Sequence, residues 1–158
     1  MTYRIAINDD TKQSAGTVLA RAPSWTGDTE PAGPVLAGIL AGSSAEDVLR
    51  CAFAEARRRA EPLRVLLTGP APAADEDLHL RDLIERWAEK YPAVSVTVAV
   101  RHDVDAAITL TGASRHCGLL VVAQHADGRD AAVVQALTRR AHCPVMVATS
   151  VGTGLLRD

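Results

Sequence analysis

From Val35 onward, short apolar runs alternate with segments whose apolar residues recur at helical spacing. After the run 35–40, apolar residues are three, one, three, one and three positions apart, as on one face of a helix: Ala45, Val48, Leu49, Ala52, Phe53 and Ala56. The run 63–67 follows, and then a second stripe of this kind: Leu80, Leu83, Ile84, Trp87, Ala88 and Tyr91. Strands that are apolar throughout and alternate with helices are buried on both faces, so the pattern predicts an α/β protein with a parallel sheet covered by helices on both faces.

The same alternation continues toward the C-terminus. It predicts further strands at 94–100, 119–123 and 144–149. It also predicts a helix capped by Asp103 that ends near Ser114, and another from about 130 to 141. With the runs 35–40 and 63–67 the chain then has five strands, and right-handed crossovers between parallel strands leave few topologies for them.

The first 34 residues do not follow this pattern. Tyr3 to Ile7 is the convincing strand there, and residues 22–34 are rich in Pro, Gly, Ser and Thr, which is typical of a linker. We therefore divide the chain into an N-terminal extension (1–34), an α/β domain (35–150) and a C-terminal tail (151–158). Two possibilities stay open for the extension: it adds an edge strand or covers a face of the domain, or it is a mobile arm.

Size and composition exclude several classes. A chain of 158 residues and 16.7 kDa forms one domain. The formal charge of -2 and pI near 6.2 give no electrostatic reason to expect nucleic acid or a membrane as a partner. The N-terminus lacks a signal-peptide pattern and no apolar stretch approaches the roughly 20 residues of a membrane span, so we expect a cytoplasmic protein. Three cysteines without a CxxC pair fit reduced thiols.

Open parallel sheets bind ligands beyond the carboxyl ends of their strands. In this chain those ends fall at residues 40–44, 69–72, 101–103 and 124–130. Polar residues and glycines in three of these segments are therefore the candidate binding residues: Gly42, Ser43, His102, Gln124, His125, Gly128 and Arg129.

Four segments resemble the universal stress protein family in their order and spacing. Residues 38–43, Gly-Ile-Leu-Ala-Gly-Ser, stand where that family commonly has Gly-Val-Asp-Gly-Ser, and 54–65 resembles its first helix running into strand two. Residues 102–104 stand at its Gly-Asp-Pro turn, and 119–122 resembles strand four. The resemblance covers about residues 35–149. It implies a Rossmann-like or flavodoxin-like sheet of order 3-2-1-4-5, and a homodimer through the fifth strand, Pro144 to Thr149.

The residues with which nucleotide-binding members of that family hold adenosine triphosphate differ here. Those members use an Asp at the end of strand one and a loop of the form GxxGx9G(S/T), whose backbone amides wrap the phosphates. Leu40 replaces the Asp, Ala123 and Ala126 replace the early glycines, and Ala131 and Ala132 replace the closing Gly and Ser/Thr. Four residues instead of nine lie between these pairs. We therefore interpret the chain as a degenerate member without the ATP-binding glycine motif, with a vestigial pocket and no cofactor.

Charged residues near the predicted helix ends lead to two interpretations. Ser43 and Glu46 form a capping-box pattern. The Glu46 carboxylate would repel a phosphate group at the start of that helix, and Asp127 and Asp130 would do the same before the last helix. Gly128 and Arg129 are the compensating residues in the latter loop. The run 57–59, three arginines between two glutamates, is interpreted as a solvated helix face.

Two His-Cys pairs suggest a metal site. His116-Cys117 precedes the fourth predicted strand and His142-Cys143 the fifth, so the four side chains share one sheet edge if those strands are neighbours, and two Cys with two His are zinc ligands. Adjacent residues point in different directions, however, and a Cys before Pro-Val is common in the resembled family as a small buried filler. We therefore predict no metal. No recognisable Ser-His-Asp, paired-carboxylate or Cys-His signature is present, so we predict no catalytic residue.

Three hypotheses for the function follow. The first is a cytoplasmic, homodimeric regulatory protein without turnover that acts through contacts with an unknown protein partner or through an unidentified ligand. The second is a nucleotide or small-anion binder that uses the shortened loop 124–129. The third is a hydrolase related to the adenine-nucleotide alpha-hydrolase superfamily. The apolar fifth strand would be an aggregation hazard unless covered, and the alternative to a dimer is that the N-terminal extension covers it.

Overall fold

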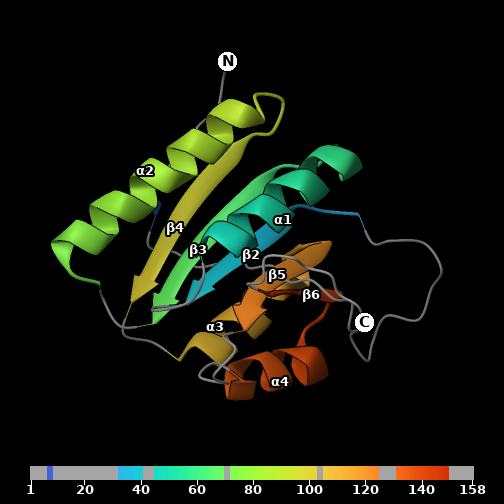
Figure 1. Cartoon of the computed structure of the whole chain (residues 1–158). Helices are drawn as coiled ribbons and strands as arrows, with labels where there is room; N and C mark the ends of the chain where they lie inside the picture. The colour runs from blue at the N-terminus through green and yellow to red at the C-terminus, as the bar shows by residue number, and fades with distance from the viewer. Residues whose placement is uncertain are drawn as a thin grey trace.

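The computed structural model describes residues 7–8, 32–40, 45–69, 72–102, 105–124 and 131–149. These ranges form a parallel sheet with helices on both faces (Figure 1). The strands are β1 (Ile7–Asn8), β2 (Val35–Leu40), β3 (Leu63–Gly69), β4 (Val96–His102), β5 (Leu119–Gln124) and β6 (Val145–Thr149). The helices are α1 (Ala45–Arg59), α2 (Ala74–Lys90), α3 (Ala106–Ala113) and α4 (Ala131–Arg140), and a 3-10 turn, η1 (Ser114–His116), follows α3.

The strand order is β1-β4-β3-β2-β5-β6. The five strands from β2 to β6 therefore have the predicted order 3-2-1-4-5, and all their pairings are parallel. The extension adds an edge strand, because Ile7 and Asn8 pair with Val98 and Ala99 of β4. This strand lies at the opposite edge of the sheet from β6, so β1 is remote from β6.

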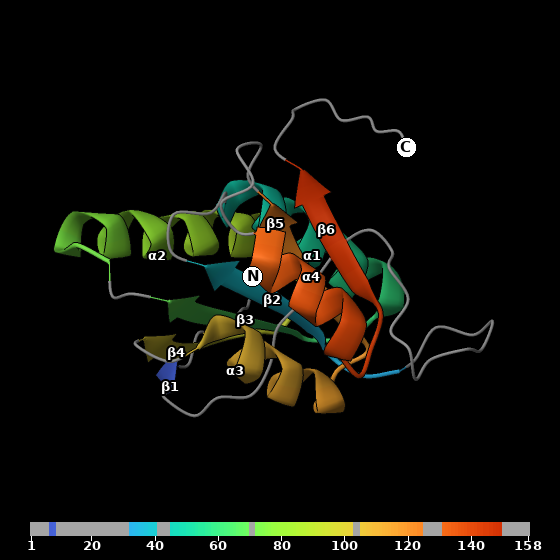
Figure 2. The ribbon, with the colours of Figure 1, turned by 90° about the horizontal axis from the view of Figure 1, so that it is seen from below.

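The helices form two layers around the sheet. Helices α1 and α2 cover one face, and α3 and α4 cover the other (Figures 1 and 2). Right-handed crossovers explain this division. The chain moves in one direction across the sheet from β2 to β4 and in the opposite direction from β4 to β6, so the connecting helices change faces.

The core consists mainly of aliphatic side chains from the inner strands and from the inward stripes of the helices. All six residues of β2 are buried, and the predicted stripe of α1 is buried from Val48 to Ala56, with Ala45 half-buried. Phe53 of α1 is fully buried and lies 5.5 Å from Tyr91 and 6.4 Å from Trp87, measured between ring centroids. The stripes of the first two helices therefore pack against each other.

Two helix ends depend on local chemistry. The N-cap of α3 is Asp105, whose Oδ1 accepts a hydrogen bond from the Ile108 N–H at 3.0 Å. The prediction of Asp103 as this cap was wrong, because β4 continues to His102 and the helix begins two residues later than expected. At the end of α1, the N–H groups of Ala60 and Glu61 bond back to the Arg57 and Ala56 carbonyls, and Ala60 has φ of 58°. This is a Schellman motif, formed without the usual glycine.

The pairing of β2 differs between its two sides. It pairs with β3 over its whole length, from Val35 to Leu40. With β5 it pairs only from Val35 to Ala37. Hydrogen-bonded pairing between β2 and β5 thus stops at mid-strand, and this is where the strand order reverses. An α/β sheet of this type places its ligand crevice at such a switch point.

Candidate functional site

The candidate site is the switch point between the carboxyl ends of β2 and β5. Of the predicted binding residues, the structure describes His102 fully and the backbone of Gln124 at the end of β5. The others lie outside the described residues: Gly42, Ser43, His125, Gly128 and Arg129. The described strands nevertheless define what the walls of the switch point consist of.

Where the structure describes these walls, they are apolar. Ile39 and Leu40 of β2 are 5% and 4% exposed, and Val122 and Ala123 of β5 are 0% and 1% exposed. Leu40 occupies the strand end where the resembled family has an Asp, and its side chain is part of the core. These four residues therefore supply no hydrogen-bonding side chain for the sugar or base of a nucleotide.

Acidic side chains lie at the starts of the helices that follow the carboxyl ends of β2 and β3. Glu46 and Asp47 lie in the first turn of α1, and three acids lie in the first turn of α2, at 75–77. Asp47 is buried and forms an ion pair with Arg50, three residues further along the helix. Carboxylates in a first helical turn stabilise the helix dipole and also repel phosphate from the amides there. The electrostatics therefore disfavour an anion at the start of α1.

Thr68 Oγ1 and His102 Nδ1, at the carboxyl ends of β3 and β4, are buried polar atoms without a hydrogen-bond partner in the structure. Thr68 is 1% exposed. Buried polar atoms are almost always hydrogen-bonded, and an orphan costs about 1–3 kcal/mol. A polar ligand or a water molecule would relieve this cost. Sequence reasoning missed Thr68, although a hydroxyl at the end of an apolar strand, next to the 69–72 segment, was a usable signal.

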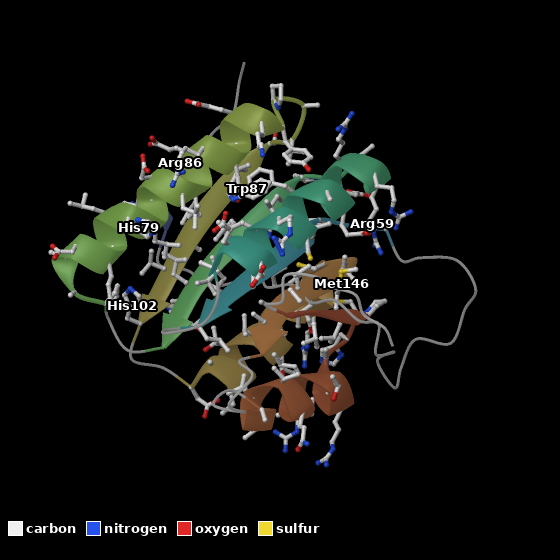
Figure 3. All side chains as sticks on the ribbon, in the orientation of Figure 1. Arg59, His79, Arg86, Trp87, His102 and Met146 are labelled. Atoms are coloured by element: carbon white, nitrogen blue, oxygen red, sulfur yellow. The ribbon has the colours of Figure 1, made fainter. Side chains whose placement is uncertain are left out.

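The sheet register separates Thr68, His102 and Gln124. Thr68 is in register with Leu40 and Arg101, so these three side chains share one face of the sheet. His102 is the residue after Arg101 and points to the opposite face, because side chains alternate along a strand. Gln124 lies three strand spacings from β4, about 14 Å away. The structure therefore does not bring His102 and Gln124 together. Figure 3 shows His102 at the carboxyl end of β4, on the side where α2 begins.

The two His-Cys pairs lie at the amino ends of β5 and β6. These strands are neighbours, as the metal hypothesis required. Cys117 and Cys143 are buried, whereas His116 and His142 are exposed. Burial raises the pKa of the Cys143 thiol to about 12, although the nearby Arg59 guanidinium opposes the shift. No group of three or more His, Cys, Asp or Glu residues in the described ranges is arranged to hold a metal ion.

Hydrogen bonds hold this amino-end cluster together. The His142 N–H donates to Ser114 Oγ at 2.9 Å, and Ser114 Oγ donates to the Thr111 carbonyl at 2.7 Å. Arg115 Nε donates to His142 Nε2 at 3.4 Å, and Cys117 Sγ donates to the Ala113 carbonyl at 3.5 Å. These contacts join the turn after α3 to the turn before β6, which is a structural role.

Comparison with known proteins identifies the class of fold. No family model and no curated protein matches the chain. Among solved structures, the chain is similar to the universal stress protein from Archaeoglobus fulgidus, with a TM-score of 0.54 and 17% identity over 75% of this chain and 99% of that chain. The chain thus has a universal stress protein-like α/β fold. In the described part of the chain, no helix combines the length and the apolar character that a membrane crossing requires.

Proposed function

We propose that this chain is a cytoplasmic regulatory protein of the universal stress protein type, which acts through protein contacts, without turnover and without binding ATP. The observation that supports this proposal is the apolar switch point. Leu40 is buried where a nucleotide-binding relative has an acid, and the paired Asp47 carboxylate lies in the first turn of α1. Both features remove favourable contacts from a bound nucleotide and add none in return.

The edge of β6 supports a homodimer as part of this proposal. Leu120 N–H donates to the Pro144 carbonyl at 3.0 Å. In a parallel strand the N–H and C=O groups of successive residues point to alternate sides. Met146 and Ala148 therefore direct their N–H and C=O groups toward β5, as Pro144 does with its carbonyl, and Val145 and Val147 direct these groups outward. In the described sheet β6 has β5 as its one neighbour. An apolar strand with outward backbone groups fits pairing with the same strand of a second copy.

The nucleotide part of the proposal is tested by thermal unfolding with magnesium and ATP, ADP, AMP or cyclic nucleotides. A ligand at a hundred times its dissociation constant adds about 2.7 kcal/mol to the free energy of unfolding, an effect that this measurement detects. We expect no shift with any of them. A clear shift with one nucleotide would refute the proposal that the protein acts without binding nucleotides.

The dimer is tested by sedimentation velocity of wild type, Val147→Pro and Met146→Lys. Proline at 147 removes an outward N–H and leaves the bonds from 146 and 148 to β5 in place. Lysine at 146 instead places a charge on the edge strand. We expect wild type to sediment as a dimer and both variants as folded monomers, with folding checked by circular dichroism. A monomeric wild type, or folded variants that stay dimeric, would contradict pairing through β6.

A second candidate function, binding of a nucleotide or small anion, is favoured by the orphan Thr68 hydroxyl. If a nucleotide or inorganic phosphate does stabilise the protein, we expect Arg129→Ala to abolish the shift when the shortened loop binds it, and Thr68→Val to weaken it when the hydroxyl is a contact. Hydrolysis of ATP that disappears in His102→Ala or His125→Ala would instead support an enzyme.

A further inference from the structure

Charge is segregated between the two ends of the sheet. At the carboxyl ends, acids occupy the first turns of α1 and α2. At the amino ends, where the helices terminate, there are eight basic side chains and only three carboxylates among the described residues, Glu55, Glu61 and Glu89. The basic residues are Arg57, Arg58, Arg59, Arg64, Lys90, Arg115, Arg139 and Arg140. The whole chain has a formal charge of -2, so this positive end results from the fold and not from the composition.

These eight residues lie at the end of the sheet where the strands begin, which we call the basic end, and two side-chain contacts link its segments. Arg59 Nη1 donates to the Gly118 carbonyl at 3.3 Å, which links the end of α1 to the start of β5. Arg115 Nε donates to His142 at 3.4 Å, which links η1 to the turn before β6. Figure 3 shows Arg59 at the end of α1, on the side where the strands begin. The arginines in the last turns of α1, η1 and α4 therefore lie at the same end of the sheet.

Most of this charge has no carboxylate beside it. Arg58 and Arg59 share Glu55, at 2.9 and 3.3 Å. Arg57 lies over the Tyr91 ring, 5.9 Å from its centroid. Over the ranges that the structure describes, no ion pair joins a carboxylate to Arg57, Arg64, Arg115, Arg139 or Arg140. A cation in the last turn of a helix interacts favourably with the helix dipole. The last turns of α1 and α4 contain three and two arginines, more than this interaction explains, and together they create a positive field.

A pocket adjoins the basic end. It encloses about 370 Å³ between the end of α1 and the turn before β4. Its lining combines small and aliphatic residues with Ser95, the Arg57 guanidinium and the Glu61 carboxylate, whose Oε2 accepts the Gly33 N–H at 3.2 Å. The small and aliphatic part of the lining suits an aliphatic side chain, and the exposed Arg57 guanidinium suits an acidic neighbour of that side chain.

We propose that the basic end docks an acidic segment of a partner protein, with carboxylates on the arginines and an aliphatic side chain in the pocket beside Arg57. This inference rests on the proposed function, action through protein contacts, and adds the chemistry of the partner. Nucleic acid fits less well, because the aromatic rings beside this surface already carry cations. Arg57 lies over the Tyr91 ring and Lys90 lies over the Trp87 ring, so neither ring offers a free platform for a base.

The test is fluorescence anisotropy of the full chain with a labelled 12-residue peptide of Glu and Asp around a central Leu. The control peptide has Gln and Asn in place of the acids. We expect the acidic peptide to bind at least about tenfold more tightly, and its affinity to fall as salt rises from 50 to 200 mM, because salt screens exposed charges. The variant Arg115→Gln/Arg139→Gln should lose about tenfold in affinity. The matched control Arg81→Gln/Arg86→Gln removes the same charge from α2 and should stay within about twofold.

Four results would overturn the inference. They are equal binding of the two peptides, equal losses in the two double variants, tighter binding of a 12-nucleotide single-stranded RNA, and head-to-tail self-association that Arg115→Gln/Arg139→Gln abolishes. The last would make the acidic end of a second copy the occupant. A negative peptide result without any nucleotide shift would refute the docking surface alone. A nucleotide shift would count against the proposed function whatever the peptide does.

Discussion

The amino ends of the strands are tied together by backbone hydrogen bonds and aromatic packing, whereas the carboxyl ends contain buried polar atoms without partners. At the amino ends, Val35 N–H donates to the Pro62 carbonyl at 2.9 Å, and Leu63 N–H donates to the Ser95 carbonyl at 2.8 Å. The Gly118 N–H donates to the Pro34 carbonyl at 2.9 Å. At the carboxyl ends, Thr68 and His102 each have an unsatisfied atom.

Gly33 shows how closely the amino-end segments approach one another. It has φ of +129°, and a Cβ there would lie 3.1 Å from the Gly118 nitrogen, so both the backbone conformation and the space favour glycine. The Gly33 N–H also donates to Glu61 Oε2 at 3.2 Å. The difference between the two ends teaches that, among the described residues, backbone hydrogen bonds between neighbouring segments gather where strands begin. The unsatisfied Thr68 and His102 atoms lie where strands end.

The largest expected effect is at the amino ends, in the aromatic cluster. Phe53→Ala removes a fully buried ring that packs on Trp87 and Tyr91, and we expect it to lower the free energy of unfolding by about 3–5 kcal/mol. Urea denaturation followed by circular dichroism measures this. Leu78→Ala is the control, because Leu78 is 67% exposed and should change stability by less than about 0.5 kcal/mol. A loss below about 1 kcal/mol for Phe53→Ala would mean that the cluster does not anchor this end.

A smaller loss is expected for Ser114→Ala, also at the amino ends. Ser114 is fully buried, and its hydroxyl accepts from the His142 N–H. Removing it leaves that donor without its acceptor, which costs about 1–3 kcal/mol. Thr138→Ala is the matched control, since it deletes an exposed hydroxyl bonded to the Gln135 carbonyl and should cost little. Equal effects in the two variants would show that the link between η1 and the turn before β6 is dispensable.

High pH should lower the free energy of unfolding through Cys143, which lies at the amino ends of the strands. Burial raises the pKa of this thiol from 9.0 to about 12. The unfolded chain therefore loses the proton near pH 9 while the folded chain keeps it, so this contribution is present below pH 9 and is lost as pH rises toward 12. The expected loss is about 1.4 kcal/mol per pH unit in that window. Unfolding of wild type and Cys143→Ala at pH 8, 9 and 10 measures it, and the variant should show the shallower decline. Parallel declines would refute the shift.

At the carboxyl ends, Asp105→Ala should cost about 1 kcal/mol. The carboxylate caps α3 by accepting from the Ile108 N–H, and the loss of an N-cap typically costs about 0.5–2 kcal/mol. Asp105→Asn keeps an acceptor oxygen and should retain most of the stability. Chemical denaturation of wild type and of the two variants measures these changes in stability. An Asn variant as unstable as the Ala variant would show that the charge of Asp105, and not its hydrogen bond, stabilises the helix.

The smallest effect, and the one of opposite sign, is expected for Thr68→Val. The hydroxyl is buried without a partner, so replacing it with a methyl group should leave stability unchanged or raise it by up to about 1 kcal/mol. A thermal scan of the ligand-free protein measures the change. A loss above about 1 kcal/mol would show that the hydroxyl is satisfied in solution and would remove the contrast between the two ends.

Periodic features of this chain were predictable from sequence because they reflect burial. The stripe of α1 and the apolar run of β2 gave the elements, and their alternation gave the parallel sheet with helices on both faces. The resemblance to universal stress proteins supplied the strand order. Boundaries set by a single cap were harder to predict. The helix after β4 begins at Ala106 because Asp105 provides the cap, and Asp103 looked equally suitable in the sequence.

The candidate site was only partly predictable, because the relative positions of its residues depend on the sheet. His102 was chosen because it follows a predicted strand, but register places it on the opposite face from Thr68 and several strands from Gln124. Distances across a sheet depend on strand order and on the alternation of side chains. Neither is visible in a list of residues near strand ends.

The sequence by itself determined the α/β class of this protein and its helical stripes, because both depend on residue type and on spacing along the chain. The tertiary structure alone decided three other features: the early end of pairing between β2 and β5, the orphan Thr68 hydroxyl, and the gathering of arginines from α1, η1 and α4 at one end. The reason is physical. Pairing, desolvation and electric fields depend on distances between residues remote in sequence, and those distances exist only once the sheet has formed.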